Sequence, residues 1–347
     1  MTMLLYFHIP FCASKCGYCA FNSIINNIDL HLPYFQAMQT QLKSFLYHLN
    51  PSIESVFIGG GTPNIVNFWL YENLFQIFMP FVQKNAEITL EANPEFLNVE
   101  FIRHIQEYGV NRISMGVQSF STQKLQWLER NATPHSIQSA FIALDQANFK
   151  NINIDLIYGT PFDDSLQLLN ELESLQQLPI THLSAYHLSI ENGSKFKQDK
   201  RQNYEGEEFS FLLEKAGWWQ YEVSNYVQCK EWICQHNLGY WNRKEYIGVG
   251  AGAVGFLQNY RYTNLLSIQE YIKNPKYIKK EFLSSQEESL ERLFLGLRCA
   301  IIGVKKTDVP NQENLDIAIK EGIVEERSGR IYAKSLLLAD EIALFLS

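Results

Sequence analysis

Short runs of apolar and β-branched residues alternate along the first half of the chain with longer stretches that repeat apolar residues at helical spacing. The short runs cover 4–8, 56–58, 88–91, 112–117, 152–157 and 183–187, and each predicts a strand. The longer stretches cover 34–49, 70–83, 101–108, 136–147 and 166–178, and each predicts a helix. A helix after each strand is typical of a parallel sheet with helical crossovers.

Six such units predict an α/β fold, a partial (β/α)6 barrel, in which ligands gather at the carboxyl ends of the strands. The alternation stops near residue 200, and an aromatic-rich stretch then runs to about residue 256. Further helices are predicted over 268–280, 287–299 and 315–322, and 323–332 has a turn at Ser328-Gly329 that suggests a winged-helix shape. We therefore expect a domain at 1–200 and a smaller, mainly helical C-terminal domain at 201–347.

Composition and charge narrow the function classes. Hydrophobic residues make up 46% of the 347 residues and charged residues 19%, as in compact globular proteins. With 29 basic and 37 acidic side chains the formal charge is -8, so nucleic acid is not an expected partner. The apolar start at 3–7 is too short for a signal peptide, and no run reaches the roughly 20 residues of a membrane span. We expect a cytoplasmic protein.

Three of the six cysteines, Cys12, Cys16 and Cys19, lie in a C-x3-C-x2-C pattern directly after the first predicted strand. In a reducing compartment such a group indicates metal ligands rather than disulfides. Three thiolates can hold a [4Fe-4S] cluster and leave one iron open to a ligand. The alternatives are a zinc site, which normally takes four protein ligands, and three unrelated buried thiols.

The run 6–19 resembles the opening of radical SAM proteins and is most similar to the branch that contains coproporphyrinogen dehydrogenases and HemW-type heme chaperones, the oxygen-independent coproporphyrinogen III oxidase-like family. The resemblance covers most of the chain. It continues through the motifs GGGTP at 59–63, LEANP at 90–94, GVQSF at 116–120, DLIYG at 155–159, YEVSN at 221–225, HNLGYW at 236–241 and GVGAGA at 248–253. It implies a partial radical SAM barrel of TIM type over 1–200 and a HemW- or HemN-like domain after it.

The resemblance also implies that S-adenosylmethionine (SAM) binds at positions spread over several strand ends. These are Tyr6, Tyr18, Gly60, Gly61, Thr62, Glu91, Gln118, Arg130 and Asp155. The residues themselves fit this chemistry, because a glycine run lets backbone groups approach a ligand and a carboxylate can accept from ribose hydroxyls. Taken singly, each could be an ordinary polar residue at a strand end, and Arg130 could be a surface charge on a helix.

Two departures from the dehydrogenase pattern favour the heme chaperones. Phe21 stands where the dehydrogenases have a fourth cysteine, and only eleven residues precede Cys12, so their N-terminal extension is expected to be absent. We therefore expect a heme chaperone that binds heme, a [4Fe-4S] cluster and SAM. The alternative is an oxygen-independent coproporphyrinogen III dehydrogenase. The acidic charge weakens a third alternative, a tRNA-modifying enzyme.

The HNLGYW motif provides candidate heme contacts, His236, Tyr240 and Trp241, because haem iron accepts His or Tyr and a porphyrin face prefers flat apolar partners. Trp218, Trp219, Trp232 and Trp241 could form an aromatic pocket there. The alternative is that the motif packs a core and that His236 is a buried, satisfied histidine. Cys229, Cys234 and Cys299 are too few for a second cluster and are expected to be incidental thiols.

The resemblance implies as partners heme, an acceptor hemoprotein such as one of the respiratory chain, and an electron donor such as flavodoxin or ferredoxin. A monomer–dimer equilibrium is also expected. Whether SAM is cleaved, and so whether the chain is an enzyme, stays open at this point, as do the heme's axial ligand and the identity of its acceptor.

Replacing Cys12, Cys16 and Cys19 together by Ala should abolish iron binding and the broad visible absorbance of an iron–sulfur protein, because thiolates are the ligands of such clusters. Iron analysis and absorbance after anaerobic reconstitution measure this. Full iron retention in the triple variant would contradict the cluster assignment.

Overall fold

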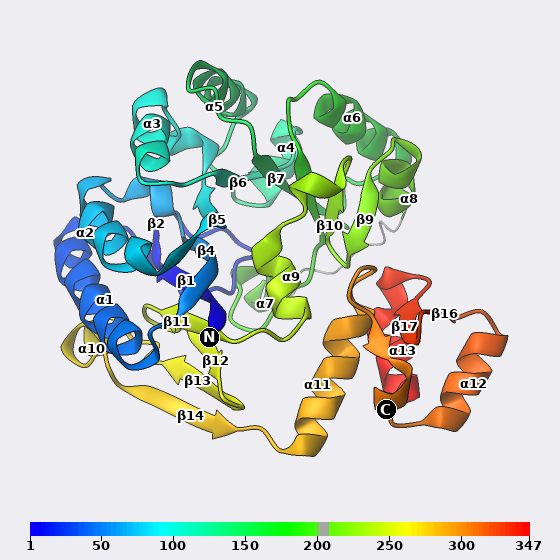
Figure 1. Cartoon of the computed structure of the whole chain (residues 1–347). Helices are drawn as coiled ribbons and strands as arrows, with labels where there is room; N and C mark the ends of the chain where they lie inside the picture. Colours follow the sequence, from blue (N-terminus) through cyan, green and yellow to red (C-terminus); the bar gives the residue numbers. More distant parts are fainter. Residues whose placement is uncertain (200, 202–207) are drawn as a thin grey trace.

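The computed structural model describes residues 1–199, 201 and 208–347. All six predicted strands are present, and they form a parallel sheet in chain order (Figure 1). They are β1 (Thr2–Ile9), β4 (Ser52–Gly60), β5 (Val82–Ala92), β6 (Arg112–Gln118), β7 (Ile152–Tyr158) and β8 (His182–His187). The predicted α/β partial barrel is confirmed.

Helices cover the outer face of this sheet (Figure 1). They are α1 (Ile28–Leu49), α2 (Trp69–Phe78), α3 (Val99–Glu107), α4 (Thr122–Trp127), α5 (Pro134–Gln146) and α6 (Ser165–Gln176). Five of them begin after a polar side chain that accepts a hydrogen bond from the first turn, which fixes the start of each helix. The capping residues are Asn27, Asn98, Ser121, Thr133 and Asp164.

The main core lies between the sheet and these helices. Phe7, Leu90 and Met115 from the strands meet Phe35 and Leu144 from the helices, and all five are fully buried. This burial supplies the main driving force for closing the barrel.

In the described part of the chain, no helix is both long enough and apolar enough to cross a membrane.

The sheet extends beyond the six predicted strands at both edges. Next to β1 lie β11 (Tyr246–Val249), β12 (Val254–Leu257), β13 (Tyr260–Asn264) and β14 (Ile278–Phe282), and next to β8 lie β10 (Asn225–Val227) and β9 (Trp219–Glu222). β11 runs parallel to β1, and the other added strands pair antiparallel. Short helices α7 (Lys195–Gln198), α8 (Glu208–Lys215) and α9 (Gln235–Trp241) connect these parts.

The single helix predicted over 268–280 is wrong in its second half. The structure has α10 (Ile268–Lys273) followed by β14. Pro275 explains the break, because the residue before a proline disfavours helical backbone angles. The chain then extends and pairs with β13, with Tyr262 opposite Lys280.

The C-terminal part has its own apolar cluster, which includes Leu293, Leu315, Ile331 and Ile342. It consists of α11 (Ser285–Leu297), β15 (Val304–Lys305), α12 (Gln312–Lys320), β16 (Val324–Arg327), β17 (Arg330–Ala333) and α13 (Ala339–Leu346). A helix followed by a hairpin matches the expected winged-helix shape. A division after residue 200 stays a prediction, since the strands from β9 to β14 join the main sheet and this separate cluster begins only with α11.

A buried ionic network holds the connections after β6 and β7 together. Lys124 Nζ lies 2.5 Å from Asp163 Oδ1 and 3.7 Å from Glu171 Oε1, and all three side chains are at least 98% buried. Glu171 also accepts hydrogen bonds from Ser119 Oγ and the Phe120 backbone N–H. The network therefore anchors the segment that directly follows Gln118.

Lys124→Met should lower the free energy of unfolding by about 3–5 kcal/mol, because it leaves two carboxylates buried without their cation. Urea unfolding measures the change. Lys195→Met is a matched control: its partner is Glu129, but its side chain is 55% exposed. We expect that variant to lose less than about 1 kcal/mol, and an equally small loss for Lys124→Met would show that the network does not stabilise the fold.

Candidate functional site

The three clustered cysteines lie on a loop that is closed by its own small sheet. β2 (Phe11–Cys12) pairs in parallel with β3 (Ile24–Ile25), and the Asn26 N–H donates to the Cys12 carbonyl over 2.8 Å. The thiols of Cys12, Cys16 and Cys19 line one cavity of about 410 Å³ at the carboxyl ends of the central strands. Three thiolates that line one cavity can bind three irons of a four-iron cluster and leave the fourth iron open to a ligand.

The glycine run after β4 packs directly against this loop. The Gly61 N–H donates to the Ile9 carbonyl and the Thr62 N–H to the Phe11 carbonyl, each over 2.7 Å. A Cβ on Gly61 would come within 2.9 Å of Cys12 Sγ and 2.7 Å of the Phe11 carbonyl oxygen. Glycine is therefore required here for the loop and the strand end to approach.

Arg130 is not a surface charge on a helix. It follows α4 and lines the cavity, where its Nη1 donates to Cys16 Sγ over 3.4 Å and its Nη2 to the Gly116 carbonyl over 2.7 Å. Its buried Nε has no hydrogen-bond partner among the described residues, and the same is true of Oε2 of Glu95 in the same wall. A free donor on a cation and a free acceptor on an acid suit the carboxylate and amino ends of an amino acid.

Two carboxylates lie deeper in the cavity wall, Glu91 at the end of β5 and Asp155 on β7. The Gly60 N–H donates to Glu91 Oε2 over 2.8 Å, with Gly60 at φ +113°, and Asn153 donates to Asp155 Oδ1 over 2.8 Å. Glu91 opens onto the cavity, but protein surrounds it otherwise. This desolvation is the largest of the effects that raise the pKa of Glu91 to about 7, and the nearby Asp155 acts in the same direction. Burial also raises the pKa of Asp155.

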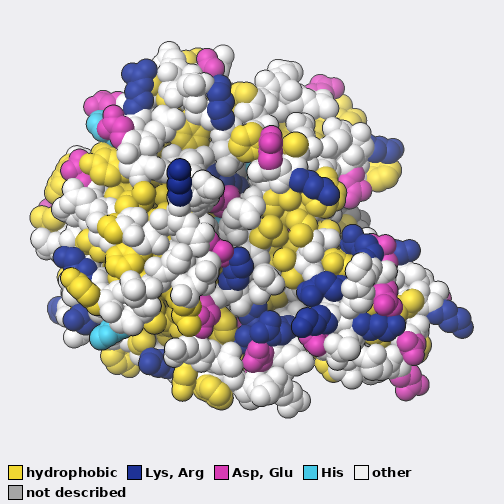
Figure 2. Space-filling view, viewed as in Figure 1, with side chains coloured by type: hydrophobic (Ala, Val, Ile, Leu, Met, Phe, Trp, Pro, Cys, Tyr) yellow, Lys and Arg dark blue, Asp and Glu magenta, His cyan; other side chains and the backbone are white. Residues whose placement is uncertain are grey.

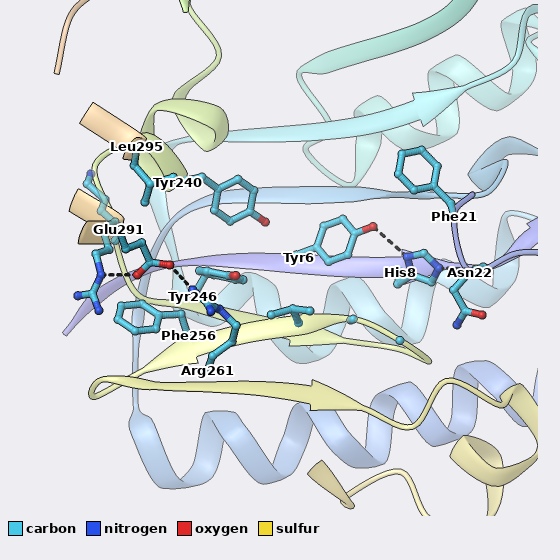
Figure 3. A pocket seen from close by; sticks show the side chains of 15 residues that line it. Tyr6, His8, Phe21, Asn22, Tyr240, Tyr246, Phe256, Arg261, Glu291 and Leu295 are labelled. Atoms are coloured by element: carbon cyan, nitrogen blue, oxygen red, sulfur yellow. Dashed lines mark hydrogen bonds and ion pairs between the residues drawn. The ribbon is translucent and has the colours of Figure 1, made fainter. Parts of the chain in front are cut away.

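Of the nine predicted SAM residues, eight line this cavity in the part of the chain that the structure describes. Tyr6 is not among the lining residues. Gln118 takes the left-handed conformation at φ +68°, which turns the chain at the end of β6. Tyr6 instead donates its hydroxyl hydrogen to His8 Nδ1 over 2.9 Å and lines a neighbouring cavity with Tyr240 (Figure 3). The donor and acceptor follow from His8 Nε2, which must carry the proton to donate to the Asn22 carbonyl.

Asn93 and Glu95 also lie in the wall and make or offer polar contacts there, and neither was predicted as a site residue. Asn93 accepts from Arg130 Nη2 over 2.9 Å and donates to Thr62 Oγ1 over 3.2 Å, so it orients both. Glu95 provides the unpaired carboxylate oxygen. Both follow Glu91 in the Glu-Ala-Asn-Pro-Glu run, where polar residues directly after a strand end were the available signal.

The candidate heme histidine is already engaged inside the barrel. His236 is 1% exposed, with Nδ1 2.8 Å from Ser55 Oγ and Nε2 2.9 Å from the Tyr240 hydroxyl. Burial lowers its pKa to about 3, so the ring is neutral. Ligation of iron would require breaking one of these bonds and moving the ring, so the geometry favours the alternative in which His236 is a buried, satisfied histidine.

The expected pocket of four tryptophans is wrong. Trp218 is buried in the main core, Trp219 is 36% exposed, and Trp232 and Trp241 line two different cavities, as far as the described residues show. Trp241 lies in the wall between α9 and the C-terminal part.

The remaining cysteines are separate thiols. Cys234 Sγ donates to Glu87 Oε1 over 3.3 Å, and Cys299 Sγ donates to the Tyr221 carbonyl over 3.5 Å. Burial raises their pKa values to about 12 and about 11, so both stay protonated. Cys229 is exposed.

Glu91→Gln should change how stability depends on pH in the protein without SAM. The native carboxyl has a pKa of about 7, above its unfolded value, so it binds a proton in the folded state that the unfolded state has released. The wild type should therefore lose stability relative to the variant as pH rises from about 4.5 to about 7, by on the order of 1–3 kcal/mol, with no further change above. Unfolding at several pH values measures this.

The same variant should bind SAM more than about tenfold more weakly, since an amide cannot accept charge-assisted hydrogen bonds. Calorimetry measures that affinity. A pH-independent stability difference together with unchanged SAM affinity would show that Glu91 is structural.

Comparisons with known proteins identify the superfamily and the fold. The radical SAM superfamily model matches residues 6–172, and members of that superfamily hold a [4Fe-4S] cluster and SAM. The fold matches a coproporphyrinogen III oxidase (HemN) from Escherichia coli, described as a radical SAM enzyme, with a TM-score of 0.83 at 19% identity over 99% of this chain and 89% of that one. Because only 19% of the residues are identical, this match shows that the two proteins share a fold and shows nothing about function.

Several relatives carry the name heme chaperone HemW. The Lactococcus lactis protein is 32% identical over 84% of this chain and 80% of its own length, and the Escherichia coli protein is 36% identical over 72% and 69%. The protein from Buchnera aphidicola subsp. Acyrthosiphon pisum is 31% identical over 93% and 92%. On these similarities, the chain belongs to the HemW family of heme chaperones within the radical SAM superfamily.

Proposed function

We propose that this protein is a heme chaperone that binds heme, a [4Fe-4S] cluster and SAM, and passes heme to an acceptor hemoprotein. The acceptor is a protein of the respiratory chain, and transfer takes place in the cytoplasm, where six free cysteines stay reduced. The family relationship supports heme binding. The observation that carries the proposal is Phe21, which lines the cluster cavity at the position where the dehydrogenases have a fourth cysteine.

Each part of the cavity has a role in this proposal. Cys12, Cys16 and Cys19 hold three irons of the cluster, and the fourth iron would meet the amino acid end of SAM near Arg130 and Glu95. Glu91 and Asp155 would accept from ribose hydroxyls. The cluster supplies one-electron chemistry when bound. Gly60, Gly61, Thr62, Tyr18 and Gln118 complete the wall.

The partners follow from the same assignment. A cluster that changes redox state needs an electron donor, and flavodoxin or ferredoxin has the right chemistry. The cysteine loop is the surface for it, since the exposed Lys15 and the partly exposed cysteines bring the cluster near solvent. A monomer–dimer equilibrium remains part of the proposal.

The anaerobically reconstituted protein should bind one equivalent of heme and should not convert coproporphyrinogen, because Phe21 provides neither the thiol nor the polarity of the cysteine it replaces. Heme absorbance and tryptophan fluorescence measure binding. Product analysis with SAM and a reductant measures turnover. Steady formation of protoporphyrinogen with matching 5'-deoxyadenosine would replace the chaperone by the alternative, a coproporphyrinogen III dehydrogenase.

A further inference from the structure

A second cavity of about 390 Å³ lies beside the cluster cavity, and neither the cluster nor SAM accounts for it. Its walls come from β1, the segment after the cysteine loop, the end of α9, β11 to β13, and α11 (Figure 3). The size is in the usual range for a site that takes a ligand as large as a cofactor. Because α11 belongs to the C-terminal part, the cavity lies where that part meets the barrel.

Aromatic rings make up much of the wall. Tyr240 and Tyr246 pack edge to face with centroids 4.8 Å apart, and the guanidinium of Arg243 lies 4.4 Å from the centre of the Phe256 ring. Figure 3 shows the Tyr6 ring between the Tyr240 and Tyr246 rings on one side and Phe21 on the other. Such a wall favours a flat, largely apolar ligand.

The wall also carries more positive than negative charge. Arg243, Lys244 and Arg261 line the cavity with one acid, Glu291, among the described residues. Lys244 Nζ pairs with Glu54 Oε1 over 2.5 Å, but Glu54 is not one of the described residues that line the cavity. Figure 2 shows Lys and Arg side chains gathered near the junction between the barrel and the C-terminal part. These cations favour an anionic group on the ligand.

Glu291 holds two of the guanidiniums in place. It accepts from Arg243 Nε over 2.6 Å and from Arg261 Nη2, while Glu288, which is outside the described wall, pairs with Arg243 Nη1 over 3.2 Å. The Arg243 side chain is 4% exposed, and its Nη2 has no hydrogen-bond partner in the described part of the chain. The Nη2 amino group of this fixed guanidinium is therefore without a partner, and Arg261, which is 35% exposed, has donors beyond the one that Glu291 accepts from.

The second cavity adjoins the cluster cavity at Phe21, which lines both and is 68% exposed. A hydrogen-bonded chain runs along the same boundary, from the Tyr6 hydroxyl to His8 and from His8 to the carbonyl of Asn22 (Figure 3). Asn22 lies three residues after Cys19 and also donates to the carbonyls of Ala251 and Leu266. A ligand in the second cavity would thus contact the residues that hold the end of the cluster loop.

We propose that this second cavity binds the porphyrin of heme, with its ring against Tyr6, Tyr240 and Tyr246 and its propionates toward Arg261 and Arg243. The inference rests on the proposed function, for which it names the binding site. Heme is flat and apolar over its faces and carries two carboxylates at one edge, which matches both properties of the wall. Phe21 then separates the porphyrin from the cluster.

The test uses the full-length, anaerobically reconstituted protein and two metal-free probes, protoporphyrin IX and its dimethyl ester. Both present the ring without iron, so axial ligation makes no contribution, and the ester lacks the carboxylates. Porphyrin fluorescence measures both affinities. We expect the free acid to bind about tenfold more tightly than the ester. Equal affinity of the two probes for the wild type would overturn the proposal whatever the variants do.

Variants locate the binding within the cavity. Arg261→Gln should weaken the free acid about tenfold and leave the ester unchanged, whereas Tyr246→Leu should weaken both. Arg298→Gln is the matched control, since Arg298 is 32% exposed and pairs with Asp340 but is not among the described residues of the cavity. Circular dichroism melts check that each variant is folded.

The outcomes separate the site from the function. If the wild type binds hemin, but Arg261→Gln and Tyr246→Leu bind both probes and hemin as the wild type does, heme binds elsewhere and the heme chaperone assignment survives. If the wild type binds neither hemin nor protoporphyrin, the proposed function fails together with the site. If Arg261→Gln does not fold, the site is tested by two other measurements. They are the porphyrin affinity of Tyr246→Leu and the difference in affinity between the free acid and the ester in the wild type.

Discussion

The site depends on one close approach between two strand ends. Gly61 and Thr62 donate backbone hydrogen bonds to Ile9 and Phe11, and this contact sets the cysteine loop against the end of β4. A side chain on Gly61 would meet both the loop backbone and the sulfur of Cys12. The position of the cysteine thiols relative to Glu91 and Arg130 follows from this contact, because the two backbone hydrogen bonds fix the loop against the glycine run.

Buried charge in the barrel is the second constraint, and Arg112 on β6 balances it. This side chain is 2% exposed, and its charge lowers the pKa of Glu91 and of Asp155, against the larger effect of burial, which raises both. The same cation helps to keep His236 neutral. The barrel interior can thus hold the two acids Glu91 and Asp155 close to a compensating cation.

The sequence predicted the features that depend on local pattern. Six strands appear as short apolar runs, and the cysteine spacing is visible without a fold. The sheet edges were not predictable in this way, because β11 joins β1 through pairing between residues more than 200 positions apart. His236 shows the same limit: its partner Ser55 is 181 positions away, and no local signal distinguishes a satisfied histidine from a free ligand. The family resemblance places Tyr6 at the SAM site, but in the structure its hydroxyl bonds to His8 and its ring lines the neighbouring cavity.

Phe21 connects the two cavities in a way that a cysteine could not. A thiol at this position would lie in the wall of the cluster cavity, where it could compete for iron. A phenyl ring cannot ligate iron, and with most of its surface exposed it can pack against an apolar ligand on either side. Phe21 therefore gives the cluster cavity no fourth thiol and gives the second cavity apolar surface. A chain that carries a porphyrin needs that surface, whereas a chain that oxidises one needs the porphyrin within reach of SAM.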